Sequence, residues 1–273
     1  MISPVFEMPL LLVERDIRVL VASDLHLGLE FELLLCGMSI PSQTERLLGQ
    51  LKDCLNDIKP DHLVLLGDIK HNVPRTSWQE KQEVPNFLKA LSSETIVDIV
   101  LGNHDGGLAD MAPLGVKVHD SSGFVLDGVG YFHGHTWPDQ RLFESEALVA
   151  GHIHPAVRFR DPLGCTLTRP AWIRANLLPG ILESHYRRKI SALELILIPA
   201  FNALCGGLPL NQPIEEERGP IIALADLDQA RVYLLDGTNL GRLGEIKDYA
   251  GKPKQERLYP EVGRSRRRRH EVE

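Results

Sequence analysis

The chain of 273 residues is 43% hydrophobic and 25% charged, which are ordinary values for a globular protein with a sizeable core. It has no apolar run of ~20 residues and no signal-peptide pattern, so we expect a soluble, cytoplasmic protein without a membrane partner. The net charge of -7 argues against a protein that coats nucleic acid through bulk electrostatics. The four cysteines, Cys36, Cys54, Cys165 and Cys205, form no C-x-x-C pair, and we expect reduced, mostly buried thiols.

The N-terminal part of the chain alternates β-branched runs with amphipathic segments. We expect strands at residues 16–23, 63–66 and 99–101, and helices at residues 44–58 and 78–91, the second helix being kinked or restarted at Pro85. In the first helix Leu47, Leu51 and Leu55 recur at helical spacing. The strand–helix–strand order predicts a pair of parallel strands with a right-handed crossover.

Beyond Asp105 the pattern changes to short apolar runs separated by turn residues, which predicts antiparallel strands. We expect these strands at residues 116–119, 123–126, 130–132, 148–150, 193–198 and 231–235, and a hairpin that joins residues 157–160 to 165–168. The Gly/Pro-rich segment 205–219 is expected to be a mobile loop that serves as a lid, a partner surface or a linker. Two sheets, each with a face covered by helices or solvent, predict a layered α/β sandwich.

The domain organisation follows from the same pattern. We expect residues 1–250 to form a single domain, with the core motifs in residues 17–160 and the later strands and loop in residues 161–250. Residues 251–273 predict a polar, basic and disordered tail, whose arginine-rich block 263–270 either remains solvated or contacts phosphate groups.

Polar side chains follow several of the predicted strands, at the point where each strand ends. They are Asp24, His26, Asp68, Asn103, His104, Asp105, His133, His135, His152 and His154. Because residues i and i+2 of an extended segment point the same way, pairs such as Asp24 with His26 can supply two convergent ligands. Oxygen and imidazole donors without thiolates suit Mn, Fe or Zn, and their number exceeds the need of one ion. We therefore expect two metal ions about 3.5–4 Å apart.

These motifs resemble those of the calcineurin-like metallophosphoesterases, whose signature is D-x-H, GD, GNH(D/E), a later histidine and GHxH. The matching stretches are Asp24-Leu25-His26, Gly67-Asp68, Gly102-Asn103-His104-Asp105, His133-Gly134-His135 and Gly151-His152-Ile153-His154. The resemblance implies a four-layer α/β/β/α sandwich with a dinuclear metal site at the C-terminal ends of strands. It further implies that the first metal is held by Asp24, His26 and His154, the second by Asn103, His133 and His152, and that both are bridged by Asp68.

The resemblance also gives His104 the role of general acid, which protonates the leaving group or steadies the phosphate. In the His-Gly-His pair either His133 or His135 could be the ligand. We prefer His133 because it directly follows a strand, and His135 then faces the substrate or supports a ligand. Asp105 either orients His104 or is an exposed turn carboxylate.

Four basic residues are further candidates for contacts with the substrate. Lys70 and His71 either bind a phosphate oxygen or belong to a solvated loop. For Arg141 and Arg158 an ordinary surface charge is the preferred interpretation.

Three further stretches are similar to the SbcD-related and DNA-ligase-associated branch of that family: residues 67–71, residues 132–135, and residues 198–202 followed by Gly206-Gly207. This similarity implies a phosphodiesterase that acts on DNA, although the chain is shorter than SbcD-type nucleases and has no obvious capping domain for duplex DNA. We expect in-line hydrolysis of a phosphodiester by a water that two divalent ions activate, with Mn²⁺ as the first choice and Fe, Zn or Ni as alternatives. The competing hypotheses are a phosphomonoesterase acting on a nucleotide or small phosphate, and a non-catalytic interaction scaffold, against which the presence of His104 argues. The sequence does not define an oligomeric state.

Overall fold

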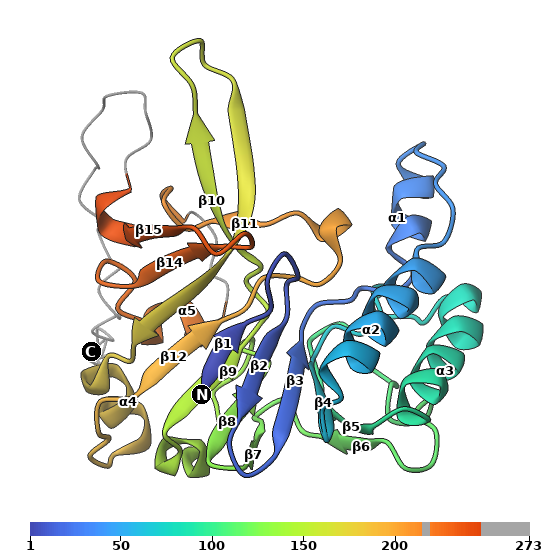
Figure 1. Ribbon diagram of the computed structural model, residues 1–273, viewed down its shortest axis with the longest axis horizontal. Helices are drawn as coiled ribbons and strands as arrows, with labels where there is room; N and C mark the ends of the chain where they lie inside the picture. Colours follow the sequence, from blue (N-terminus) through green and yellow to red (C-terminus); the bar gives the residue numbers. More distant parts are fainter. Residues whose placement is uncertain (215–218, 247–273) are drawn as a thin grey trace, which may run out of the picture.

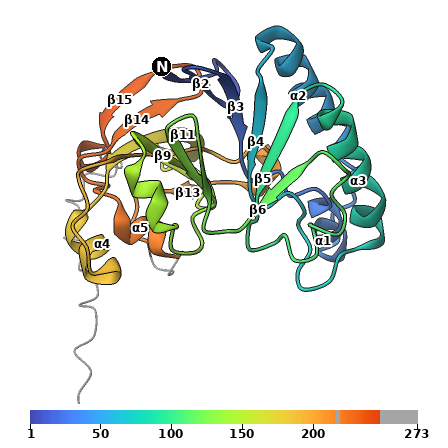
Figure 2. The ribbon, with the colours of Figure 1, turned by 90° about the horizontal axis from the view of Figure 1, so that it is seen from below.

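The computed structural model describes residues 1–214 and 219–246, which form two β-sheets packed face to face with helices on both outer sides (Figures 1 and 2). The predicted four-layer α/β/β/α sandwich is confirmed. In the described part of the chain, no helix is long and apolar enough to cross a membrane. The predicted tail, residues 251–273, lies outside the described residues, as do residues 215–218 of the predicted loop.

The first sheet has six strands in the order β1 to β6. Their bounds are β1 (Ile2–Pro4), β2 (Leu11–Glu14), β3 (Arg18–Ala22), β4 (His62–Leu66), β5 (Ile96–Val100) and β6 (Lys117–His119). Strands β3 to β6 are parallel, so the ends of β3, β4 and β5 share one edge. The helices beside this sheet are α1 (Leu29–Leu35), α2 (Thr44–Ile58) and α3 (Trp78–Ser92). Helix α3 begins at a capping box made by Ser77 and Glu80, and it continues through Pro85 without a new start.

The second sheet has nine strands and is mixed. Its strands are β7 (Phe124–Leu126), β8 (Val129–Phe132), β9 (Ala147–Ala150), β10 (Pro155–Arg160), β11 (Thr166–Asn176), β12 (Glu194–Leu197), β13 (Leu208–Pro209), β14 (Arg231–Leu234) and β15 (Asn239–Arg242). Strands β8, β9 and β12 are parallel neighbours. The predicted β10–β11 hairpin is confirmed and projects from the molecule (Figure 1). The α-helices on this side are α4 (Pro179–Tyr186) and α5 (Pro220–Leu224), and the 3₁₀ turns are η1 (Gln140–Glu144), η2 (Ala203–Cys205) and η3 (Leu243–Glu245).

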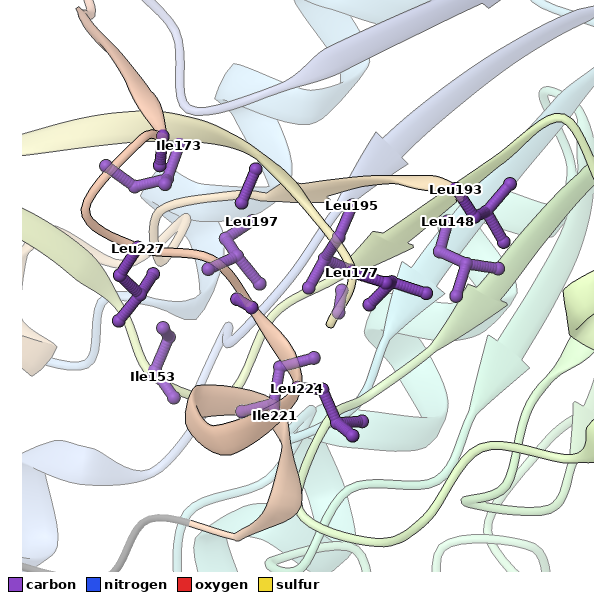
Figure 3. Close-up of a cluster of buried hydrophobic side chains, with 14 of the residues drawn as sticks. Leu148, Ile153, Ile173, Leu177, Leu193, Leu195, Leu197, Ile221, Leu224 and Leu227 are labelled. Carbon is purple, nitrogen blue, oxygen red and sulfur yellow. The ribbon is translucent and has the colours of Figure 1, made fainter. Parts of the chain in front are cut away.

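Successive side chains of a strand point to opposite faces of its sheet, so the apolar side chains are divided between separate cores. On β3, Val19 and Val21 pack between the two sheets, whereas Leu20 and Ala22 pack against the helices α2 and α3. A third core lies on the outer face of the second sheet, where β9, β11, β12 and α5 bring leucine and isoleucine side chains together (Figure 3). Burial on both faces fixes the register of the central strands and therefore the positions of the loops that follow them.

Several sequence predictions are corrected by the structure. The segment predicted as an antiparallel strand at residues 116–119 joins the first sheet as β6, parallel to β5. The expectation of antiparallel pairing also fails between β8 and β9 and between β9 and β12. The strands β1, β2, β13 and β15 and the helices α1, α4 and α5 were not predicted. The four cysteines are free, but none is buried, because two are exposed and two are half-buried.

Candidate metal centre

The predicted site residues lie in loops that follow five strands from both sheets. Asp24 and His26 follow β3, Asp68 follows β4, and Asn103 follows β5. From the second sheet, His133 follows β8, while His152 and His154 follow β9. Packing of the two sheets thus brings the ends of these strands together at one edge of the molecule.

The backbone at this edge adopts the left-handed conformation, which residues other than glycine rarely adopt. Asp24, His26, Asp68, His152 and His154 all have positive φ angles, of 58°, 44°, 50°, 70° and 45°. Hydrogen bonds between loops hold this backbone in place, since the amide of Asp24 donates to Gly67 O and the amide of His26 donates to Asp68 O, at 3.1 and 2.8 Å. Such strained residues concentrate at functional sites, where surrounding structure over-determines them.

Three groups of side chains have the composition and spacing of metal sites, and one of them, His26, His71 and His104, contains histidines alone. The other two groups combine aspartate with histidine. The first of these two is Asp24, His26 and His154, and the second is Asp68, His133 and His152; within each group the candidate ligand atoms lie within 4.8 Å of one another.

Asp68 belongs to the second group and also faces His26 of the first. Its Oδ2 atom is 3.6 Å from His26 Nε2 and 3.4 Å from His133 Nε2. The side chains of His26 and Asp68 are almost fully buried, with exposed fractions of 6% and 3%. A carboxylate in this position faces ligands of both groups, which is the position that a shared ligand of two ions would occupy.

The tautomer of His133 directs its second nitrogen into the cluster. His133 Nδ1 lies 2.7 Å from the carbonyl oxygen of Leu66, which can only accept a hydrogen bond, so Nδ1 carries the proton. In the neutral ring Nε2 then carries no proton, so its lone pair can bind a metal ion on the side that faces Asp68. The His135 ring is 5.1 Å from the His133 ring, and its buried Nδ1 has no hydrogen-bond partner.

Buried polar atoms without hydrogen-bond partners gather at the same place. Asp24 Oδ1, His26 Nε2, His133 Nε2 and His154 Nε2 are all buried and lack such a partner, although His154 Nε2 lies 3.2 Å from Asp24 Oδ1. Buried polar atoms are rarely left unpaired, so a convergent set of carboxylate and imidazole donors fits divalent cations. The two His/Asp clusters are consistent with a dinuclear metal site.

The electrostatics of the cluster favour positive charge at its centre. Burial alone would lower the pKa of His133, but the Asp68 and Asp24 carboxylates outweigh it and raise the pKa to about 9. Burial lowers the pKa of His26 to about 3, and burial with the nearby His133 lowers the pKa of His152 to about 4. His26 and His152 are therefore neutral, as metal ligation needs, whereas His133 would have to release its proton to bind a cation.

The turn after β5 is tied to Asp68 and to the loop that follows it. The His104 amide donates to Asp68 Oδ1 at 2.8 Å, and His104 Nδ1 is hydrogen-bonded to the carbonyl oxygen of His71. Asn103 is exposed at this turn. A Cβ on Gly102 would lie 2.2 Å from Asp68 Oδ1, so this position requires glycine for close approach rather than for an unusual φ.

Asp105 is buried and contacts backbone amides rather than the His104 ring. Its carboxylate accepts from the amides of Ile69 and Lys70 at 2.8 and 3.2 Å and from that of Gly102 at 2.9 Å. Burial raises its pKa to about 6, and the nearby Asp68 carboxylate adds to this effect. Asp105 therefore joins the loops that follow β4 and β5.

The basic candidates differ in their surroundings. Lys70 is fully buried, and its Nζ donates to the carbonyl oxygen of Asn72 at 2.7 Å. His71 Nδ1 lies 3.1 Å from His26 Nδ1, and His71 Nε2 pairs with Glu32 of α1. Arg141 pairs with Asp139 through an exposed guanidinium 2.8 Å away. Arg158 lies on the projecting hairpin.

Three residues that support the cluster were missed by the sequence analysis. Ser23 Oγ lies 2.6 Å from Asp24 Oδ2, and the buried Asn202 donates from Nδ2 to Leu25 O at 3.0 Å. Glu32 contacts His71 as described above. Ser23 directly follows β3 and Asn202 lies five residues after β12, so both carry the strand-end signal that identified the other residues. Glu32 lies on α1 and carries no such signal.

Comparisons with known proteins agree with this geometry. A family model described as calcineurin-like phosphoesterase matches residues 17–154, just over half of the 273 residues. The mouse and rat proteins named serine/threonine-protein phosphatase CPPED1 are 36% and 35% identical over 74 residues. That segment is 26% of this chain and 24% of theirs, so the chain matches about a quarter of the length of these curated relatives.

A solved structure extends the likeness to most of the chain. The crystal structure of Pseudomonas putida nuclease MPE matches with a TM-score of 0.51 at 20% sequence identity, covering 86% of this chain and 98% of that one. At this identity the match shows a shared fold.

Proposed function

The chain belongs to the calcineurin-like phosphoesterase family, and from that premise we propose that it hydrolyses phosphodiesters at the His/Asp cluster, with DNA or a nucleotide as substrate. The observation that carries the proposal is the convergence of buried, unpaired Asp24, His26, His133 and His154 atoms around Asp68. The Pseudomonas putida protein that shares this fold is described as a nuclease, which supports a nucleic-acid phosphodiester as the substrate.

Each metal ion in this proposal has its own set of protein ligands. The first ion would be held by Asp24, His26 and His154, the second by Asn103, His133 and His152, and Asp68 would be shared. Bound divalent ions would neutralise phosphate oxygens and lower the pKa of the water that attacks phosphorus. We expect Mn²⁺, with Fe, Zn and Ni as alternatives, since carboxylate and imidazole ligands accept all four.

His104 acts as the general acid in this proposal. The carbonyl oxygen of His71 accepts a hydrogen bond from His104 Nδ1, so the ring is held in one orientation and Nε2 carries the proton that is transferred. The amide of His104 is fixed on Asp68, and Asp105 holds the adjoining turn. These contacts hold His104 beside Asp68, which supports its proposed role as proton donor.

The direct test is hydrolysis by the Mn²⁺-loaded protein of bis(4-nitrophenyl) phosphate, 4-nitrophenyl phosphate and a single-stranded oligonucleotide. We expect turnover of both diesters and little of the monoester. Hydrolysis of the monoester alone would contradict the proposal and favour the second candidate, a phosphomonoesterase, which the names of the mouse and rat relatives support. No hydrolysis with any of the four metals would favour a non-catalytic scaffold.

A further inference from the structure

An apolar groove of about 420 Å³ lies between α1 and the loop that leads into α3. Phe31 of α1 and Trp78, the first residue of α3, line it, with exposed fractions of 41% and 78%. Helix α1 projects beyond α2 and α3 in Figure 1, which leaves its outer surface open. Two large aromatic side chains exposed across one groove are unusual on a surface that binds only water.

The groove has a rigid wall. Glu80, which is fully buried, accepts from the amides of His71 and Asn72 through Oε1, at 2.9 and 2.7 Å. Its Oε2 accepts from the amide of Ser77 at 2.6 Å. One carboxylate therefore fixes both ends of the loop 71–77, which carries Arg75 and ends beside Trp78. A preformed groove loses little conformational entropy when it binds a flat ligand.

One wall of the groove is linked to the metal centre through the chain segment 71–72. His71, whose ring lies 3.1 Å from His26 and whose carbonyl contacts His104, directly precedes the groove residue Asn72. The ring of His71 also pairs with Glu32, the neighbour of Phe31 on α1. A phosphodiester at the metal centre would carry its attached nucleoside into this neighbourhood.

We propose that the groove binds a nucleobase next to the scissile phosphodiester, with the base against Phe31 and Trp78 and a neighbouring phosphate on Arg75. The inference rests on the proposed function and specifies its substrate as a single-stranded nucleic acid. Aromatic side chains bind bases of any sequence by stacking. Arg75 is exposed, and among the described residues none forms an ion pair with it, so its charge is available to a phosphate.

The test compares Trp78→Ala and Trp78→Phe with the wild-type protein. We expect Trp78→Ala to raise KM for a short oligothymidylate by roughly 10-fold with little change in kcat. Trp78→Phe should remain near wild type because a phenyl ring still stacks. Neither variant should change hydrolysis of methyl 4-nitrophenyl phosphate, a diester without a base. Phe6→Ala removes another exposed aromatic residue, 66% exposed on the β1–β2 turn, and serves as the matched control.

An abasic oligonucleotide of the same length distinguishes the contribution of base stacking to binding from that of the Arg75 charge. Trp78→Ala should bind it as the wild type does, whereas Arg75→Ala should weaken binding of the abasic and the base-bearing strand equally. An unchanged KM for oligothymidylate in Trp78→Ala, or an equal loss on the base-free diester, would overturn the proposal.

Fluorescence distinguishes failure of the base site from failure of the proposed function. Of the three tryptophans, Trp172 is buried and Trp137 is stacked on His185, which leaves Trp78 exposed to a bound base. Oligothymidylate should quench wild-type emission and leave that of Trp78→Phe unchanged. Quenching without hydrolysis of any diester would refute the proposed function and support the base site, while hydrolysis without quenching would refute the base site.

Discussion

At the scale of single residues, His104 is the group whose removal should affect chemistry without affecting metal binding. We expect His104→Ala to lower kcat for an oligonucleotide by about 10²- to 10⁴-fold, because the leaving alkoxide then lacks a proton donor. The loss should be much smaller for bis(4-nitrophenyl) phosphate, since nitrophenolate leaves without protonation. Steady-state kinetics on both substrates, with metal content measured in parallel, check this. Equal losses on the two substrates would show that His104 is not the acid.

His133 and His135 give a second prediction at this scale. His133 directs Nε2 at Asp68, whereas the His135 ring lies 5.1 Å from the His133 ring. We therefore expect His133→Asn to lose one metal ion per chain and His135→Asn to keep both, as measured by elemental analysis after dialysis. The reverse result would make His135 the ligand.

At the scale of elements, the strand ends could be predicted from sequence because a buried β-branched run that stops at a polar residue is a local pattern. Helix α2 has the predicted bounds because its leucines repeat at helical spacing. The parallel pairing of β6 could not be predicted, since sheet membership depends on contacts distant in sequence. Strand β11 is longer than predicted because it continues past Pro170, where its neighbour changes from β10 to β14.

The contacts that support the candidate site were hidden for the same reason. The donor types and their strand-end positions were visible in the sequence, so the composition of the cluster could be inferred. The positions of Asn202 beside Asp24, and of Glu32 beside His71, arise only when separate loops meet.

Asp98 connects three strands and provides a prediction at the element scale. It is buried on β5 and accepts hydrogen bonds from His62 of β4 and His119 of β6, both at 2.8 Å. The His119 ring stacks on Phe124 of β7 with centroids 3.7 Å apart, which links the two sheets. We expect Asp98→Ala to reduce the free energy of unfolding by about 1–3 kcal/mol, and Asp53→Ala on the exposed face of α2 to change it little.

The effect of Asp98 should depend on pH. Burial raises its pKa, but the hydrogen bonds from His119 and His62 outweigh burial and lower the pKa below 3.8. A carboxyl group whose pKa falls on folding stabilises the fold above its unfolded value and loses that contribution as pH decreases through the folded value. Denaturant unfolding should therefore show the difference between wild type and Asp98→Ala shrinking below about pH 4. A constant difference down to pH 3 would contradict this role.

At the scale of the whole molecule, the metal centre joins loops from both sheets, so bound metal should stabilise the entire fold. A ligand at a hundred times its dissociation constant adds about 2.7 kcal/mol to the free energy of unfolding. The pKa of His133 is raised on folding, so its protonation stabilises the metal-free fold most below 6.5, and that contribution is lost as pH rises through about 9. A bound cation competes with this proton.

Stabilisation by Mn²⁺ should consequently grow as pH rises from 6 to 8, and metal binding should release protons. Thermal unfolding with Mn²⁺ and with chelator, repeated at both pH values, measures the first effect. Calorimetric titration in two buffers of different ionisation enthalpy measures the second. A metal-induced rise in Tm that is the same at both pH values would contradict the account.

The central claim is that one cluster holds two divalent ions with Asp68 between them. It is tested most directly by the number of Mn²⁺ ions that each chain retains at equilibrium dialysis, measured by elemental analysis. We predict two ions per chain for the wild type and fewer for Asp68→Ala, in which both groups lose their common carboxylate. One ion or none in the folded wild-type protein would contradict the claim.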